Sequence, residues 1–225
     1  MLEFHNVSYS YGGATLLENV SLALPQGSFH FLKGPAGSGK TTFIKMCYSE
    51  LRASSGSVQI FCKDTNLANR EDVAFLRRSI GVVHQDCQFL DHLSIAENIA
   101  LPLTVAGTEN PKSHNNLDQL MAWVGLEHVA NALPPSLSGG ERQRAALARA
   151  LIGSPDVILA DEPTGNVDWD MSQRLLRLLI ELNLMGKTVL LATHDLGLIR
   201  AAKPHIQARI LRIQNKNLLL AGADL

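Results

Sequence analysis

The residues from Gly34 to Thr41 form a glycine-rich loop of the pattern Gly-x-x-x-x-Gly-Lys-Ser/Thr, which constrains the fold more than any other segment. A strand-like apolar run at 29–32 precedes the loop, and a helix-like run follows it. Glycines at such a turn let successive backbone N–H groups point toward one anion, and the lysine adds a positive charge. The pattern therefore predicts a phosphate-binding turn between a strand and a helix, although a plain glycine-rich turn could show the same residues.

Each residue type in this loop has an expected role toward a nucleotide. Lys40 would approach the β- and γ-phosphates, and the Thr41 hydroxyl would ligate Mg²⁺. The residues expected to contact the phosphates are Gly34, Pro35, Ala36, Gly37, Ser38, Gly39, Lys40, Thr41 and Thr42.

Composition favours one globular domain, which we expect to span residues 1–225. Of the 225 residues, 46% are hydrophobic, which is enough to bury one substantial core. The formal net charge is −1, so there is no overall positive field, and we expect no nucleic-acid partner. Arg142, Arg144 and Arg149 are expected to lie on solvated or ion-paired faces.

Cysteine usage favours a cytoplasmic location. Cys47, Cys62 and Cys87 form no Cys-x-x-Cys pair and are odd in number, which suits free thiols in a reducing compartment better than a zinc site. The first residues do not resemble a secretion signal, and no apolar run approaches the ~20 residues that span a bilayer. Any membrane role would therefore come from a partner.

The pattern of apolar runs predicts an α/β chain. Residues 2–32 alternate short β-rich runs with turns, which favours antiparallel pairing. Residues 86–152 lack strand patterns and are expected to be helical, with loops at 107–115 and 134–135. Further strands are expected at 58–61, 80–83, 157–160, 188–192, 209–213 and 217–220, and helices at 40–51, 70–78 and 172–184.

Two carboxylates, Asp161 and Glu162, follow the apolar strand expected at 157–160. The carboxyl end of a strand beside a phosphate loop is where α/β sheets place ligand-binding residues. Asp161 is expected to hold Mg²⁺ through water, and Glu162 to act as the general base or to position the attacking water. A solvated acidic turn is the alternative explanation.

The string Leu-Ser-Gly-Gly-Glu-Arg-Gln at 137–143 opens an alanine-rich helix, with Ser138, Gly139 and Gly140 at its N-terminus. Free N–H groups at that end would form a second phosphate-binding site. One nucleotide fold has little use for two such ends unless the second completes the site of a neighbouring subunit. The sequence therefore predicts a head-to-tail dimer of two copies with ATP between them, although a helix simply capped by Ser138 would show the same string.

Five motifs occur in an order that resembles the ABC-type ATPases over almost the whole chain. They are the phosphate loop, Gln85, the Leu-Ser-Gly-Gly-Glu string, Asp161-Glu162 and Thr193-His194-Asp195. The resemblance implies an α/β P-loop NTPase fold: a nucleotide-binding domain with a RecA-like core sheet, an N-terminal antiparallel β subdomain and an inserted α-helical subdomain at about 86–152. It also implies an Mg²⁺-dependent ATPase that hydrolyses ATP to ADP and phosphate.

The resemblance implies roles for single residues. Gln85 would sense Mg²⁺ and the lytic water, and His194 would contact the γ-phosphate, although a histidine after an apolar strand is by itself more often structural. Ser138 and Gly140 would reach the γ-phosphate bound by the second copy. The implied catalytic residues are Lys40, Gln85, Glu162 and His194, and the implied Mg²⁺ ligands are Thr41, Gln85 and Asp161.

Further roles concern the ends of the site. Tyr11, which lies 29 positions before Lys40, resembles the aromatic residue on which these ATPases stack adenine, and Tyr9 is its competitor. Asn166 and Asp168 would form the loop that joins the two sites of a dimer.

Within the family, residues 161–168 resemble the branch of the lipoprotein-release, macrolide-export and cell-division ATPases. The strings at 75–86 and 95–103 look most like the bacterial cell-division ATP-binding proteins, the FtsE family. This implies an integral membrane partner resembling FtsX, a peripheral place on the cytoplasmic face of the bacterial inner membrane, and activation of septal cell-wall hydrolysis. The alternative is the ATPase subunit of a lipoprotein-release or macrolide-export complex.

The segment 86–103 is the expected docking groove for a cytoplasmic helix of the membrane partner. Its apolar residues Phe89, Leu90, Leu93 and Ile95 could equally be core of the helical part.

Overall fold

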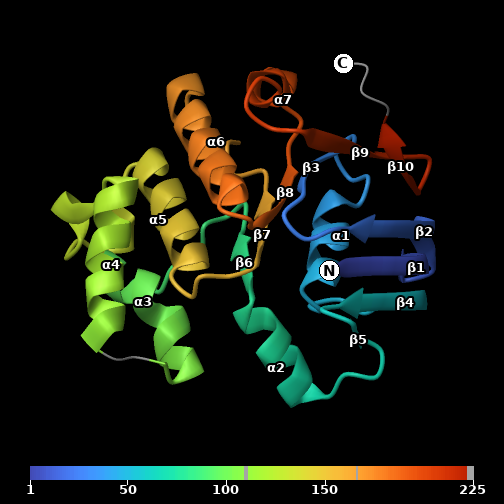
Figure 1. Ribbon diagram of the computed structural model, residues 1–225, viewed down its shortest axis with the longest axis horizontal. Coiled ribbons are helices and arrows are strands. Elements are labelled where there is room, and N and C mark those ends of the chain that lie inside the picture. Colours follow the sequence, from blue (N-terminus) through green and yellow to red (C-terminus); the bar gives the residue numbers. More distant parts are fainter. Residues whose placement is uncertain (109–110, 166, 222–225) are drawn as a thin grey trace.

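A computed structural model describes residues 1–108, 111–165 and 167–221 as two sheets and seven helices, with the four-stranded sheet at one side of the molecule (Figure 1). The four-stranded sheet has the order β2-β1-β4-β5, and the six-stranded sheet has the order β10-β9-β3-β8-β7-β6. The strands are β1 Leu2–Tyr11, β2 Ala14–Leu24, β3 Phe29–Lys33, β4 Ser55–Ile60, β5 Lys63–Asp64, β6 Ile80–Val83, β7 Val157–Asp161, β8 Thr188–Ala192, β9 Ala208–Gln214 and β10 Asn217–Ala221. The helices are α1 Lys40–Cys47, α2 Arg70–Arg78, α3 Ile95–Ala106, α4 Pro111–Val124, α5 Gly139–Leu151, α6 Trp169–Leu184 and α7 Leu196–Ala202, with 3₁₀ turns at Glu127–Val129 and Pro134–Ser136.

The two sheets differ in strand direction. The pairs of the four-stranded sheet are antiparallel, whereas β9, β3, β8, β7 and β6 run parallel and only β10 is antiparallel to its neighbour. The prediction that residues 2–32 pair antiparallel holds for β1 and β2 but is wrong for β3. The β3 residues Phe29 to Leu32 are buried on both faces, a pattern typical of a central parallel strand.

Alternating side chains of the six-stranded sheet face two different cores. Leu32, Leu159 and Leu190 pack with Phe43 and Ile44 of α1 in the space toward the four-stranded sheet. On the opposite face, other sheet residues pack against helices α5, α6 and α7; they include Phe31, Ile158, Leu191, Leu147, Leu176 and Leu198. Helices α1 and α5 therefore lie on opposite faces of the same sheet, as Figure 1 also shows.

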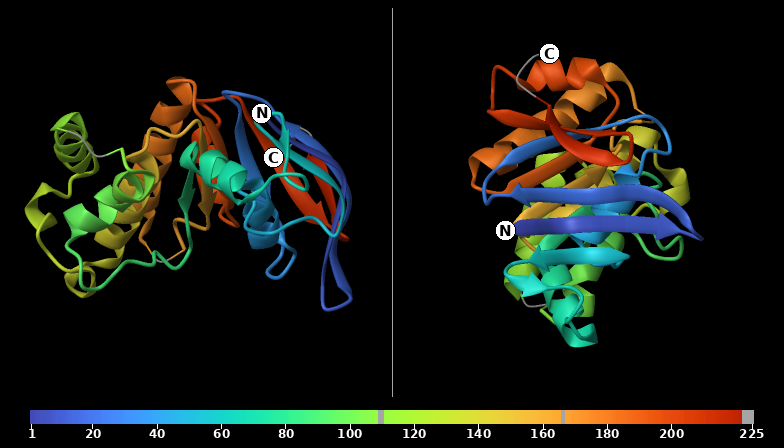
Figure 2. Two further views of the ribbon diagram at one scale, coloured as in Figure 1. Left: turned by 90° about the horizontal axis from the view of Figure 1, so that it is seen from below. Right: turned by 90° about the vertical axis from the view of Figure 1, so that its right-hand side faces the viewer.

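Helices α3, α4 and α5 share a third core at the end of the molecule away from the four-stranded sheet (Figure 2). Ile95, Ile99 and Leu126 are fully buried there. Ile95 is therefore a core residue and not part of an exposed groove. The predicted loop at 107–115 is too long, because α4 already begins at Pro111, and proline is well accommodated in the first turn of a helix.

Two predicted helix boundaries also shift. The helix expected at 172–184 begins at Trp169, because the Asp168 carboxylate accepts a hydrogen bond from Met171 N at 2.8 Å and so caps the helix. Helix α1 ends at Cys47 rather than at Leu51. No helix in the described part of the chain combines the length and the apolar character that a membrane span needs.

A buried histidine makes the stability of the fold sensitive to pH. His30 of β3 is 1% exposed, and its Nδ1 has no hydrogen-bond partner among the described residues. Burial, aided by the positive charge of Arg209, lowers the pKa of His30 to about 4 from its ordinary value of 6.5. The imidazole therefore stays neutral in the folded chain at pH values where the unfolded chain already binds a proton.

We predict that acidification from pH 7 to pH 5 destabilises the protein by about 2 kcal/mol through His30 alone. The lowered pKa means that this loss begins near pH 6.5 and is complete near pH 4. The variant His30→Leu should lack this component, and urea unfolding at pH 7, 6 and 5 measures it. Parallel pH profiles for the wild type and the variant would contradict the prediction.

Candidate nucleotide-binding site

The phosphate loop lies between the carboxyl end of β3 and the start of α1. Gly37 and Gly39 have φ angles of 74° and 103°, a left-handed backbone that favours glycine. At Gly39 a Cβ would also lie 3.2 Å from the Leu16 side chain. The Gly39 carbonyl accepts the hydrogen bond of Phe43 N at 2.8 Å, which starts the helix. The strand–loop–helix order predicted from the sequence is therefore present.

Three charged or ionisable side chains from separate segments meet beside the loop. Lys40 Nζ lies 3.6 Å from Glu162 Oε1, and His194 Nδ1 lies 2.8 Å from Glu162 Oε2. Lys40 Nζ also donates to the carbonyl oxygens of Gly34 and Pro35, at 3.0 and 3.3 Å. The Lys40 and Glu162 side chains are each 11% exposed, whereas that of His194 is 73% exposed. The fold thus brings together Lys40, Glu162 and His194, three of the four predicted catalytic residues.

Asp161 ends β7 with a buried carboxylate. Its Oδ1 has no hydrogen-bond partner among the described residues. Burial raises the pKa of Asp161 and outweighs the opposing effect of the Thr41 hydroxyl beside it. A buried carboxylate oxygen without a donor is costly unless a cation occupies its neighbourhood. Together with the Thr41 hydroxyl, this donor set of hard oxygens fits Mg²⁺.

Gln85 is exposed and follows β6. The segment 84–90 around it is held by side chains of helix α5. Cys87 Sγ donates to Gln143 Oε1 of α5 at 3.1 Å, and Arg149 Nη1 donates to the Gln88 carbonyl. The guanidinium carbons of Arg149 and Arg142 lie 4.7 and 5.5 Å from the centre of the Phe89 ring.

The prediction that the arginines of this helix lie on solvated or ion-paired faces is therefore wrong for Arg142 and Arg149. Both pack on an aromatic ring and hold backbone carbonyl groups, because Arg142 Nη1 also donates to Pro134 O at 2.9 Å. Arg144, in contrast, donates to the sulfur of Met171 at 3.4 Å. These contacts come from tertiary packing and leave no signal in the helix sequence.

Ser138 caps α5 through a reciprocal capping box with Glu141. Ser138 N donates to Glu141 Oε2 at 2.8 Å, and Glu141 N donates to Ser138 Oγ. The bond from the Ser138 hydroxyl lowers the pKa of Glu141, so the carboxylate is held in its charged form. Gly139 is exposed and Gly140 half-buried at the same helix end, against Met171. This end belongs to the face of the sheet opposite α1, so the structure does not bring it to the chain's own phosphate loop.

The structure separates the two candidate tyrosines. Tyr9 is 8% exposed and belongs to the core next to α1, whereas Tyr11 at the end of β1 is 53% exposed. Their rings meet edge to face at 4.9 Å. Tyr11 therefore has a free surface for a base, and Tyr9 supports it from below. Asn166 lies outside the described residues, and Asp168 caps α6.

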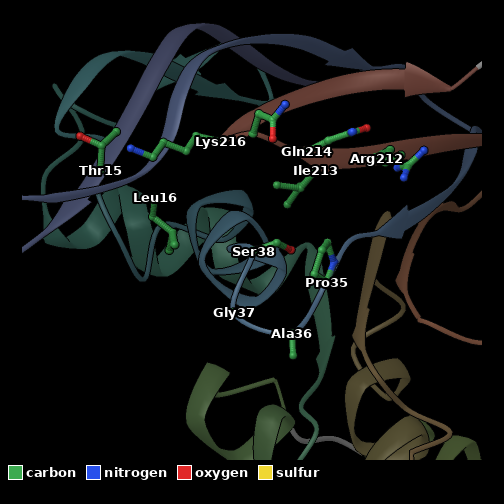
Figure 3. Close-up of a pocket in the computed structure, with 11 residues that line it drawn as sticks. Thr15, Leu16, Pro35, Ala36, Gly37, Ser38, Arg212, Ile213, Gln214 and Lys216 are labelled. Atoms are coloured by element: carbon green, nitrogen blue, oxygen red, sulfur yellow. The ribbon is translucent and has the colours of Figure 1, made fainter.

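A pocket of about 490 Å³ adjoins the phosphate loop (Figure 3). Leu16 and the loop residues 35–38 form one wall, and Arg212 and Lys216 of the β9–β10 hairpin bring positive charge from the other side. The sequence reasoning missed Leu16, Arg212 and Lys216, because they lie in no motif and reach the loop only through the pairing of β3 with β9 and through the β1–β2 hairpin.

The phosphate loop, which includes Lys40, lies between a parallel strand and a helix. Two carboxylates and a histidine lie beside it at the ends of adjacent strands, and this arrangement defines a P-loop nucleotide-binding protein. The family profile described as ABC transporter matches residues 17–165. The chain belongs to this family, as an ATP-binding cassette. The α/β P-loop fold that the sequence predicts is thereby confirmed.

Several characterised proteins are similar over almost the whole chain. The cell division ATP-binding protein FtsE of Haemophilus influenzae is 41% identical over 202 residues, covering 89% of this chain and 93% of that protein. FtsE of Escherichia coli K12 is 42% identical over 201 residues, covering 88% and 90%. The dimeric post-hydrolysis structure of the ATP-binding cassette MJ0796 bound to ADP and Pi superposes with a TM-score of 0.86 at 32% identity, covering 97% of this chain and 96% of that one.

The anchoring of the Gln85 segment yields a stability prediction. Phe89→Ala removes packing and both guanidinium–ring contacts, so we expect a loss of about 2 kcal/mol in unfolding free energy, measured by urea titration. Amide exchange of residues 84–90 should also become faster. The neighbouring Leu90→Ala, whose side chain is 42% exposed, is the matched control and should change stability by under about 0.5 kcal/mol. Equal effects of the two variants would refute the anchoring role.

Proposed function

We propose that this chain is the ATP-binding and ATP-hydrolysing subunit of a membrane-associated ABC complex of the FtsE type. The observation that carries the proposal is the contact of Glu162 with both Lys40 and His194 beside the phosphate loop. Membership of the ABC family supports ATP as the substrate, and MJ0796 with ADP and Pi is an example of a cassette after hydrolysis.

In this proposal the loop and Lys40 bind the phosphates. The backbone N–H groups of residues 37–41 and the start of α1 supply hydrogen bonds and a favourable helix dipole, and Lys40 turns from the Gly34 carbonyl to the β- and γ-phosphates. Thr41, Asp161 and Gln85 would hold Mg²⁺, which neutralises phosphate charge when bound. The fit rests on the unpartnered Asp161 oxygen and on the exposed amide of Gln85.

Glu162 and His194 act at the γ-phosphate end. Glu162 orients the attacking water and accepts its proton as the water oxygen bonds to phosphorus and the bridging bond to ADP breaks. His194 Nδ1 lies 2.8 Å from the Glu162 carboxylate, and its Nε2, which has no hydrogen-bond partner among the described residues, would meet the γ-phosphate from the exposed side. Tyr11 would stack the adenine.

A second copy would complete the site. Helix α5 lies on the sheet face opposite α1, so Ser138, Gly139 and Gly140 serve a nucleotide only when another chain brings one to them. Asn166 and Asp168 would join the two sites of such a dimer. The dimeric MJ0796 structure supports this arrangement.

The partner is proposed to be an integral membrane protein resembling FtsX, which places the chain on the cytoplasmic face of the inner membrane and in cell division. The FtsE relatives support this choice over a lipoprotein-release or macrolide-export complex. Of the apolar residues predicted for the docking segment, Leu90 is exposed and Phe89 and Leu93 are half-buried, whereas Ile95 is buried. The buried Asn98 amide fixes the backbone of this segment through bonds to the Leu90 and Leu93 carbonyls, each at 3.0 Å.

The first functional prediction concerns binding. Lys40→Ala removes the phosphate-facing charge, and calorimetric titration with Mg-ATP should show affinity reduced by at least about 100-fold. Lys63→Ala, which breaks an exposed ion pair with Asp72, is the control and should bind as the wild type does. Tight binding by Lys40→Ala would show that residues 34–41 are not the site.

The second functional prediction concerns dimerisation. Glu162→Gln keeps the shape of the side chain but removes the base, so ATP should bind without being hydrolysed and should trap a dimer. Size-exclusion chromatography with light scattering in Mg-ATP measures this. Glu71→Gln, an exposed carboxylate of α2, should not accumulate dimer. A Glu162→Gln variant that binds ATP but stays monomeric would contradict the proposal that two copies form the site.

A further inference from the structure

The ring of Trp169 packs directly on the backbone of Gly197. A Cβ at position 197 would lie 2.9 Å from Cη2 and 3.1 Å from Cζ3 of Trp169 and 3.0 Å from Asp195 Oδ1, and the first of these distances is shorter than real Cβ atoms show. Glycine is therefore the residue that fits beneath this ring. Trp169 is nevertheless 46% exposed, so the ring covers the Gly197 backbone from the surface and is not a core residue.

This contact joins the two chain segments that carry the catalytic groups. Trp169 begins α6, which follows Glu162, and Gly197 lies in the first turn of α7, which follows His194. The start of α7 is fixed internally, because Asp195 Oδ1 accepts hydrogen bonds from Gly197 N at 2.7 Å and Leu198 N at 3.3 Å. The Trp169 ring thus packs on the hydrogen-bonded turn 195–198, which directly follows His194.

His194 depends on such external support. Its side chain is 73% exposed, and the bond to Glu162 is the one side-chain hydrogen bond of His194 among the described residues. Glu162 itself has a φ of 48°, a left-handed conformation that is unfavourable for a glutamate and must be held by its surroundings. The 2.8 Å bond therefore ties together two segments, neither of which fixes the pair alone.

We infer that Trp169 is a positioning residue for His194, acting through Gly197 and Asp195. The segment from Glu162 to α6 contacts the segment from His194 to α7 at two points. One is the hydrogen bond between His194 and Glu162, and the other is the packing of the Trp169 ring on Gly197. Two contacts prevent the rotation of one segment against the other that a single contact would allow. The inference rests on the proposed ATPase function, because its consequence is measured on hydrolysis. Trp169 is not among the described residues that line the pocket beside the phosphate loop, so nucleotide binding should be spared.

The test is a size exchange between the two residues. Trp169→Phe removes Cη2 and Cζ3, the atoms nearest Gly197, and Gly197→Ala adds the methyl group that meets them. We expect each variant to lower kcat about tenfold and to leave KM for ATP within about twofold, as the loss of transition-state positioning does. In the double variant the methyl group occupies the space vacated by the ring and keeps Asp195 Oδ1, at 3.0 Å, as its close neighbour, so kcat should return to within about threefold of the wild type. Trp123→Phe, at the other tryptophan of the chain, is the control and should leave kcat and KM unchanged.

The possible results separate the inference from the proposed function. A wild type that releases no phosphate from ATP refutes the proposed function, whatever the variants do. With an active wild type, unchanged kcat in Trp169→Phe, or a double variant about 100-fold slower as independent losses predict, overturns the positioning role. A drop in kcat that only follows the folded fraction measured by thermal unfolding overturns it too, whereas recovery in the double variant supports it.

Discussion

The structure depends on one constraint: β3, β6, β7 and β8 run parallel, so their carboxyl ends meet at one edge of the sheet. Each of these strands delivers one chemical group there. β3 delivers the phosphate loop, β6 the segment with Gln85, β7 the two carboxylates and β8 His194. A single strand slip or reversal would separate the group from the others, because side-chain direction alternates with each residue. The buried, nearly all-apolar strands thus fix the chemistry by fixing direction and register.

The same sheet explains why the chain holds two anion-binding helix ends that do not serve one ligand. Its alternating residues bury α1 on one face and α5 on the other, so the whole sheet with its side chains separates the two helices. The effect of a helix dipole at an N-terminus falls off within the first turn, so the N-terminus of α5 contributes nothing to a phosphate on the α1 side. Symmetry between two copies is the economical way to use both ends.

The sequence predicted the loop, the strand ends and the signature helix because short motifs and apolar periodicity report local structure directly. The prediction from sequence was wrong or incomplete where contacts between segments far apart in the chain determine strand direction or side-chain packing. The sequence predicts an antiparallel β3 because the runs next to it in sequence pair antiparallel, yet its partners β8 and β9 lie more than 150 positions away. The arginines on Phe89, the pocket residues Arg212 and Lys216, and the ring on Gly197 likewise need tertiary structure. Only the structure distinguishes the two candidates for base stacking, because it buries Tyr9 and leaves Tyr11 exposed.

The electrostatics of Glu162 link nucleotide binding to catalysis under the proposed mechanism. Lys40 lies 3.6 Å from Glu162 in a place where both side chains are 11% exposed, so their attraction is stronger than it would be in water. A triphosphate in the loop competes for the same ammonium group with greater negative charge and with the backbone N–H groups beside it. As Lys40 turns to the phosphates, Glu162 loses its cation but keeps His194. The Glu162 carboxylate is then released from Lys40 but still oriented by His194, so the arrival of the substrate itself opens Glu162 to the attacking water.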